Sequence, residues 1–67
     1  MSTQTFTVTG MTCGHCVASV TEEVSELSGV ENVDVDLATG AVTVTSTEPL
    51  EDDAVRAAVE EAGYQLA

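Results

Sequence analysis

The residues best suited to chemistry lie in one short segment near the N-terminus. Residues 10–16 read Gly-Met-Thr-Cys-Gly-His-Cys, and they hold both cysteines, Cys13 and Cys16, and the only histidine, His15. A strand-like run precedes the segment and a helix-like run follows it, so the Cys-x-x-Cys pair is expected at a helix N-terminus. Unpaired backbone N–H groups and the helix dipole favour negative charge there. The position therefore favours thiolates, the form of cysteine that reacts and binds metal.

Three other uses of a cysteine pair fit this sequence poorly. A structural zinc site takes four ligands, and His15 lies between the cysteines, where it can hardly reach the same ion. An iron–sulfur cluster takes four thiolates, and a disulfide across so short a loop gains little entropy. Two interpretations stay open. The pair holds a soft ion, of which Cu(I) is the main biological case, or it is a thiol–disulfide redox pair.

Length and charge limit the class of protein. Sixty-seven residues suffice for one small domain over residues 1–67, with one sheet and one helical layer. No apolar run approaches the roughly 20 residues that cross a bilayer, and the N-terminus lacks the features of a signal peptide. We therefore expect no membrane insertion and a cytoplasmic location. Twelve acidic residues against the single basic Arg56 give a net charge of −11, which excludes nucleic acid as a partner because its phosphates need basic patches.

Hydrophobic periodicity predicts six elements. Alternation predicts strands over residues 3–9, 31–37 and 41–46, with a turn at 38–40 and a short last strand around Tyr64 and Leu66. Apolar stripes predict helices over residues 15–28 and 51–62, which end at Gly29 and Gly63. The residues expected to face the core are Phe6, Val8, Val17, Val20, Val24, Leu27, Val33, Val35, Leu37, Val42, Val44, Val55, Ala58, Val59 and Ala62.

The order of these elements predicts the fold class. Each helix has one apolar stripe and each main strand has one apolar face, so the chain should form two layers. We expect an α+β, ferredoxin-like βαββαβ fold, in which a four-stranded antiparallel sheet carries two helices on one face. The acids of the first helix, Glu22, Glu23 and Glu26, should face solvent. Arg56 should pair locally with Asp52 and Glu60, which lie four residues away on either side.

At this point the chain resembles the heavy-metal-associated domain over its whole length. The resemblance rests on the segment 10–16 after the first strand and on the pair Gly63-Tyr64 after the second helix. In its length and in the Gly-His filling between the cysteines, the chain is similar to free-standing bacterial copper chaperones. Thr12 stands where zinc-preferring members often carry Asp. One departure is that some relatives present basic residues beside the site, whereas this chain has none there.

This resemblance implies a function and a set of roles. It implies one Cu(I) ion bound by Cys13 and Cys16 and passed by thiolate ligand exchange to the metal-binding domain of a copper-exporting P-type ATPase. It also allows a homodimer bridged by the metal. Met11 is expected beneath the loop and Tyr64 beside it. His15 is expected as an exposed spacer, with tuning of the thiolates from outside as the alternative, and not as a ligand of the ion. Such a carrier is not an enzyme. The alternatives are a small redox protein or a module for another soft metal, such as zinc or mercury.

Overall fold

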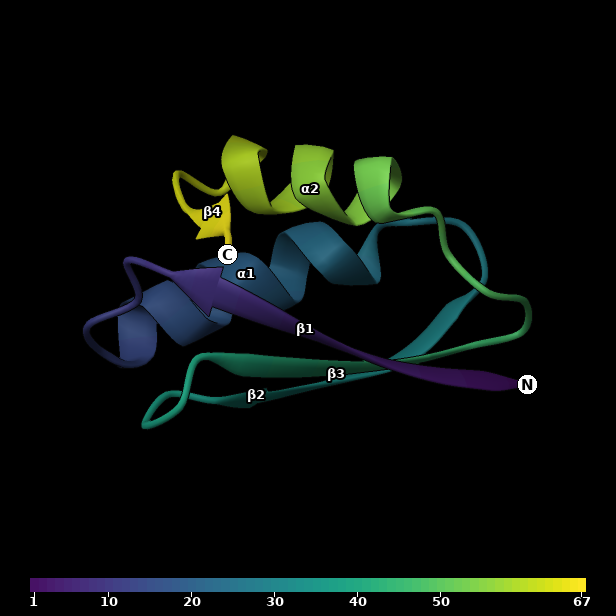
Figure 1. The fold of residues 1–67 in the computed structure, drawn as a ribbon, viewed down its shortest axis with the longest axis horizontal. Helices are drawn as coiled ribbons and strands as arrows, with labels where there is room; N and C mark the ends of the chain where they lie inside the picture. The colour runs from purple at the N-terminus through teal and green to yellow at the C-terminus, as the bar shows by residue number, and fades with distance from the viewer.

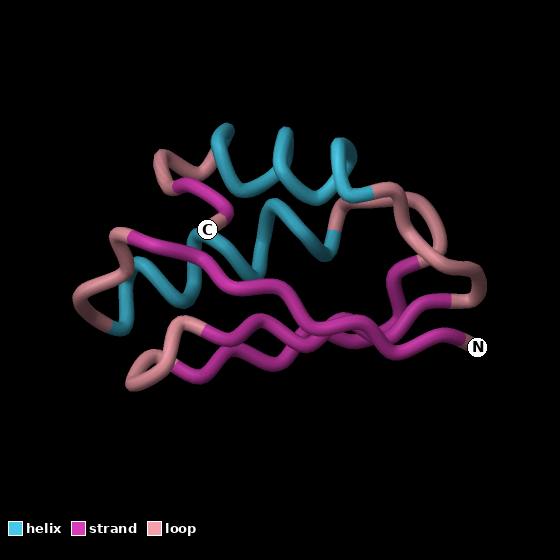
Figure 2. The backbone as a smooth tube through the Cα atoms, viewed as in Figure 1, coloured by secondary structure: helices cyan, strands magenta, loops and turns pink.

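The chain forms one antiparallel sheet with both helices on the same face, in a computed structural model that describes residues 1–67 (Figure 1). In chain order the elements are β1 (Ser2–Thr9), α1 (Gly14–Ser25), β2 (Val30–Asp36), β3 (Ala41–Ser46), α2 (Asp52–Glu61) and β4 (Gln65–Leu66). The strand order is β2-β3-β1-β4, and Figure 2 shows the helices together on one side of the strands. The predicted fold class is confirmed. Neither helix is both long enough and apolar enough to cross a membrane.

Valine supplies most of the core between the sheet and the helices. Branching at Cβ suits valine to a pleated, half-buried surface, and the two central strands β1 and β3 provide Val8, Val42 and Val44. The helices contribute the remaining buried members of the cluster from the other layer, which are Val20, Val24, Val55, Ala58 and Val59. Because valine has only a modest helix propensity, the mutual burial of these side chains must hold both layers together.

A complete C-terminal cap ends α2 and redirects the chain. Gly63 has a φ of +98°, which glycine adopts without a steric penalty. The Gly63 N–H donates to the carbonyl of Glu60 at 2.9 Å, and the Tyr64 N–H donates to that of Val59 at 3.0 Å. These are the two bonds of a Schellman motif. The cap turns the chain back toward β1, where β4 pairs beside Val8 and Thr9.

The largest boundary error lies at the end of the first helix, and the other predicted ends lie within one residue of the observed ones. The first helix ends at Ser25 rather than at residue 28, because Glu26 and Leu27 donate to carbonyls only three residues back and tighten the last turn. Leu37 was expected to face the core but is 40% exposed. Strand β2 stops at Asp36, whose carbonyl accepts the Gly40 N–H at 2.8 Å. Leu37 therefore belongs to the turn that this bond closes.

The prediction for Arg56 was also wrong in its partners. Its guanidinium donates to Asp53, three residues before it, at 2.9 Å and not to Asp52 or Glu60. Both side chains of the pair are at least half exposed, so the pair contributes little to stability. Of the other expected inward residues, all but Val17 lie in the core or packed against it. Val17 is half-buried outside that cluster, so its expected place in the core was wrong. The residues packed against the core are likewise half-buried, and they are Phe6, Leu27, Val33, Val35 and Ala62.

Gly40 should tolerate no side chain, because the turn between β2 and β3 closes directly on β1. Its φ is +79°, and a Cβ built there would lie 2.6 Å from the Val8 carbonyl oxygen. We predict that Gly40→Ala lowers the free energy of unfolding by more than the about 1–2 kcal/mol that a left-handed alanine costs. Urea denaturation measures this change.

Gly63→Ala is the matched control. Gly63 also has a positive φ, but no atom lies within 4 Å of its Cβ position. This variant should show the backbone cost alone. Equal losses of stability in the two variants would contradict the predicted clash.

Candidate metal centre

The two cysteine sulfurs lie close together where the loop after β1 enters α1. Helix α1 begins at Gly14, and Cys13 is its N-cap residue in an extended conformation. The Cys13 carbonyl accepts the N–H groups of Cys16 and Val17 at 3.1 and 3.3 Å, which closes the first turn. Both cysteines are free, and their Sγ atoms are 3.7 Å apart. This distance is well beyond the about 2.05 Å of a disulfide and short enough for one ion to contact both sulfurs.

The two sulfurs differ in access to solvent. Cys13 belongs to the loop and is exposed, whereas Cys16 is only 7% exposed. Cys16, Val20 and Val24 recur every four residues and form the buried face of α1. The sequence analysis missed Cys16 as a member of this stripe, although the spacing was available. One sulfur is thus fixed by core packing, and the other stays within reach of a visiting molecule.

The surroundings of Cys16 favour its thiolate. Its pKa is lowered from 9.0 to about 6, chiefly by a hydrogen bond from the Thr12 backbone, then by the Tyr64 hydroxyl and the Cys13 backbone, against the opposing effect of burial. The same contact raises the pKa of Tyr64, because its hydroxyl donates to Cys16 and lies beside negative sulfur. The loop backbone and the Tyr64 hydroxyl therefore stabilise the negative charge of the Cys16 thiolate, which the sequence predicted at a helix N-terminus.

The structure brings two of the three expected surrounding residues to the loop. The Tyr64 hydroxyl lowers the pKa of the Cys16 thiol, and the Tyr64 ring lies so near Gly10 that a Cβ there would be 3.3 Å from its Cδ1. Met11 is half-buried and packs against the core, as expected. His15 is exposed, and its ring nitrogens do not join the cysteine sulfurs in a common group of ligand atoms. Its alternative role in tuning the thiolates stays a prediction.

Thr12 is a contact residue that the sequence analysis did not assign. Its Oγ1 lies 3.8 Å from Cys16 Sγ, and its backbone is the largest cause of the lowered thiol pKa. Thr12 precedes the N-cap residue Cys13, so helical spacing could not have indicated this contact. Thr12 therefore joins the loop backbone in stabilising the buried sulfur.

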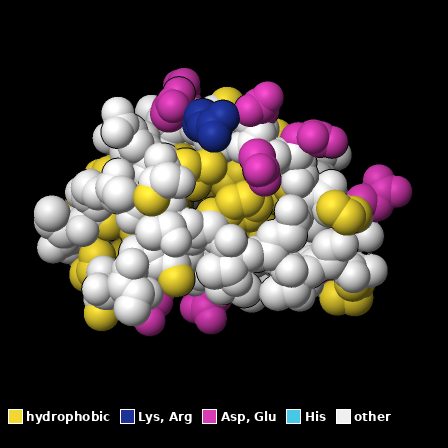
Figure 3. Space-filling view, in the orientation of Figure 1, with side chains coloured by type: hydrophobic (Ala, Val, Ile, Leu, Met, Phe, Trp, Pro, Cys, Tyr) yellow, Lys and Arg dark blue, Asp and Glu magenta, His cyan; other side chains and the backbone are white.

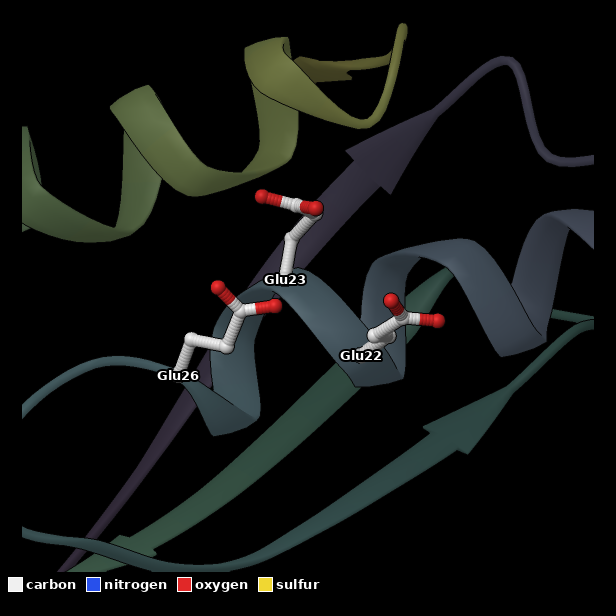
Figure 4. A group of neighbouring side chains, drawn as sticks. All are labelled: Glu22, Glu23 and Glu26. Carbon is white, nitrogen blue, oxygen red and sulfur yellow. The ribbon is translucent and has the colours of Figure 1, made fainter.

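A second group of potential ligands lies on α1, where Figure 4 shows Glu22, Glu23 and Glu26 side by side. Their carboxylate oxygens lie within 4.8 Å of one another. Glu22 and Glu26 are exposed as predicted, but Glu23 is half-buried. Burial, followed by repulsion from Glu26, Glu61 and Glu22, raises the pKa of Glu23 above its ordinary value. The group is a point of like-charge repulsion in the folded chain.

The heavy-metal-associated domain is the family whose sequence pattern matches residues 5–65. The chain belongs to this family. It is 38% identical over 68 residues to the copper chaperone CopZ of Bacillus subtilis, covering 100% of this chain and 99% of that protein. It is 37% identical over 65 residues to a segment of human copper-transporting ATPase 2, covering 96% of this chain but 4% of that protein. The solved structure of a CopZ metallochaperone superposes with a TM-score of 0.91 at 31% identity, covering 98% of this chain and all of that one.

Removing the Tyr64 hydroxyl should raise the pKa of Cys16. In a Cys13→Ser background, which leaves one thiol, thiolate absorbance near 240 nm should titrate with a midpoint below the ordinary value of 9.0. Tyr64→Phe deletes one of the hydrogen bonds to the thiolate and should move the midpoint upward. An unchanged midpoint in the Phe variant would refute the role given to Tyr64.

The lowered pKa of Cys16 also predicts how the stability of the fold changes with pH. A thiol pKa lowered on folding adds stability that is complete above the unfolded value of 9.0 and is lost as the pH falls through about 6.

Glu23→Gln should stabilise the metal-free protein at pH 7. A carboxyl whose pKa is raised by folding costs stability once it ionises, so its cost grows as the pH rises from 4.5 through the folded value. Thermal melts should show a higher midpoint for the variant at pH 7 and no gain in acid. Glu31→Gln is the control, since it makes the same change in net charge at an exposed position on β2. An equal gain in both variants would attribute the effect to net charge alone.

Proposed function

We propose that this protein is a copper chaperone that carries one Cu(I) ion on Cys13 and Cys16. The observation that carries the proposal is the pair of free sulfurs 3.7 Å apart, one exposed and one anchored, at the N-terminus of α1. Two thiolates are soft ligands, and soft ligands select Cu(I). The names of the full-length relatives agree with this assignment, because they include a copper chaperone of nearly the same length.

An ion held in line between the two sulfurs would require a small opening of the loop, whereas a bent arrangement fits the observed separation. Metal–thiolate bonds of about 2.3 Å span about 4.6 Å when they lie in line, against the observed 3.7 Å. Cys13 lies in the exposed loop and can move outward, whereas Cys16 is held on the buried face of α1. We therefore expect Cys13, and not Cys16, to move when the two sulfurs separate.

Transfer of the ion follows from this asymmetry. Two thiolates and one Cu⁺ give a site of net charge −1, which the Thr12 backbone and the Tyr64 hydroxyl help to stabilise. An incoming thiolate forms a third copper–sulfur bond on the exposed side. The bond to Cys13 then breaks, a second thiolate of the partner binds, and the bond to Cys16 breaks last. The ion keeps its oxidation state, and it never becomes free in solution.

The partner we propose is the metal-binding domain of a copper-transporting P-type ATPase. Support comes from the likeness between this chain and a segment of such an ATPase, at 37% identity across nearly all of this chain. Two domains of one family can present the same kind of thiolate pair to each other. Exchange between similar sites is then nearly balanced in free energy, so the direction of transfer depends on supply and removal of copper.

An anaerobic titration of the reduced protein with Cu(I) tests this function. We predict one Cu(I) per chain by mass spectrometry. We also predict transfer of the ion to an ATPase metal-binding domain faster than it dissociates to a chelator. Cys13→Ser with Cys16→Ser should weaken the affinity by at least about 100-fold, because hydroxyls are poor ligands for a soft cation. Tight binding retained in this double variant would overturn the proposal.

Three controls separate the remaining interpretations. His15→Ala should keep the stoichiometry of one, because His15 is exposed and not grouped with the sulfurs. Competition with buffered Zn²⁺ distinguishes copper from zinc. Catalytic disulfide reduction by the metal-free protein, without copper binding, would instead identify a redox protein.

A further inference from the structure

One edge of the sheet is left unpaired along half of β1. Strand β4 has two residues and pairs only with Val8 and Thr9, and the last bond on this side runs from the Ala67 N–H to the Thr7 carbonyl at 2.8 Å. Backbone groups alternate between the two sides of a strand. Those of Thr3 and Thr5 therefore point to the same side as those of Thr7, and they have no partner there.

A groove of about 400 Å³ follows this free edge between β1 and α2. Its walls include Thr5 and Phe6 of β1, Leu66 of β4, and Asp52 and Arg56 of α2. Figure 3 views this face and shows hydrophobic side chains in a hollow, with the only basic side chain above them. An extended strand laid beside β1 would cover the hydrophobic side chains of this mixed groove and reach the unpaired backbone.

We propose that a second copy of this chain fills the groove by pairing its own β1 edge antiparallel to this one. Ala67 lies opposite Thr7, so a new strand must begin opposite Phe6. A two-fold axis at Gln4 meets this condition, because it sets Ser2 of the second copy opposite Phe6. Thr3 of each copy then pairs with Thr5 of the other. Each such pair exchanges two backbone hydrogen bonds, and the second β1 continues the line that β4 begins.

The lack of charged side chains on β1 favours this edge of the sheet, rather than the β2 edge, for self-association. Strand β1 reads STQTFTVT, with no charge and no proline, and every acidic residue of the chain lies at position 22 or later. The opposite edge, β2, carries Glu31, Asp34 and Asp36 and has a register shift between Val30 and Asn32. Charges and bulges are the devices that keep edge strands apart. β2 has both and β1 has neither.

This dimer would leave the cysteine loops free. The loop follows the C-terminal end of β1, whereas the pairing uses its N-terminal half, near the N-terminus in Figure 1. The inference therefore does not rest on copper binding, and it differs from a dimer bridged by metal. The paired segment is short, so the association belongs at the weak end of protein interfaces. Screening should strengthen it, because each copy carries a charge of −11.

Sedimentation of the reduced, chelator-treated protein from about 10 μM to about 1 mM tests the proposal. We expect a monomer–dimer equilibrium that shifts to dimer with NaCl and persists in the Cys13→Ser, Cys16→Ser variant. Hydrogen exchange by NMR should show the Thr3 and Thr5 amides gaining protection with concentration. The Phe6 amide, which faces β3, should be protected throughout. Only monomer at every concentration and salt level would overturn the proposal, as would a dimer that needs Cu(I) or leaves Thr3 and Thr5 unprotected.

A matched pair of variants locates the interface. Thr5 and Thr43 lie opposite each other on neighbouring strands, and only Thr5 is on the free edge. Thr5→Asp should weaken association by at least about tenfold, and Thr43→Asp, with the same net charge, should leave it within about threefold. Thr5→Pro removes only an outward N–H, which an edge strand tolerates, and should also give monomer. Equal effects of the two Asp variants would contradict pairing through β1.

Discussion

Burial of one face of α1 fixes the candidate metal centre. Val20 and Val24 are fully buried against the rest of the core, so the helix cannot rotate without exposing them. Cys16 lies one turn earlier on the same face and is therefore held where Thr12 and Tyr64 meet its sulfur. The hydrophobic effect thus sets the position of a charged ligand, although burial by itself disfavours the thiolate. Hydrogen bonds from the loop backbone and from Tyr64 outweigh that penalty.

Tyr64 reaches the site through a different part of the chain. The cap at Gly63 turns the backbone after α2, and β4 then pairs with the end of β1 that leads into the cysteine loop. The second half of the fold therefore completes a site whose sulfurs both come from the first half. The same short β4 that positions Tyr64 leaves the other half of β1 uncovered. One strand thus serves the metal loop at one end and offers a free edge at the other.

The charge distribution follows the same division. Residues 1–21 contain no acidic or basic side chain apart from His15, and all twelve acids lie beyond them. Both the cysteine loop and the free edge of β1 belong to this neutral part. Long-range repulsion from the acidic remainder opposes close approach of another acidic protein. Contact at either surface then depends on sulfur, backbone hydrogen bonds and apolar side chains rather than on ion pairs.

The sequence by itself determined the family, the order of the elements and the loop that holds Cys13 and Cys16, because periodicity and residue spacing are local properties of a chain. It also indicated Met11 and Tyr64 as neighbours of the loop through the resemblance. Tertiary structure alone decided that Cys16 is buried while Cys13 is exposed, that Thr12 and Tyr64 both lower the pKa of the same thiol, and that Leu37 leaves the core. It also decided how far β4 runs along β1. These features depend on where chain segments that are distant in sequence end and come into contact. A local sequence pattern carries no information about such contacts.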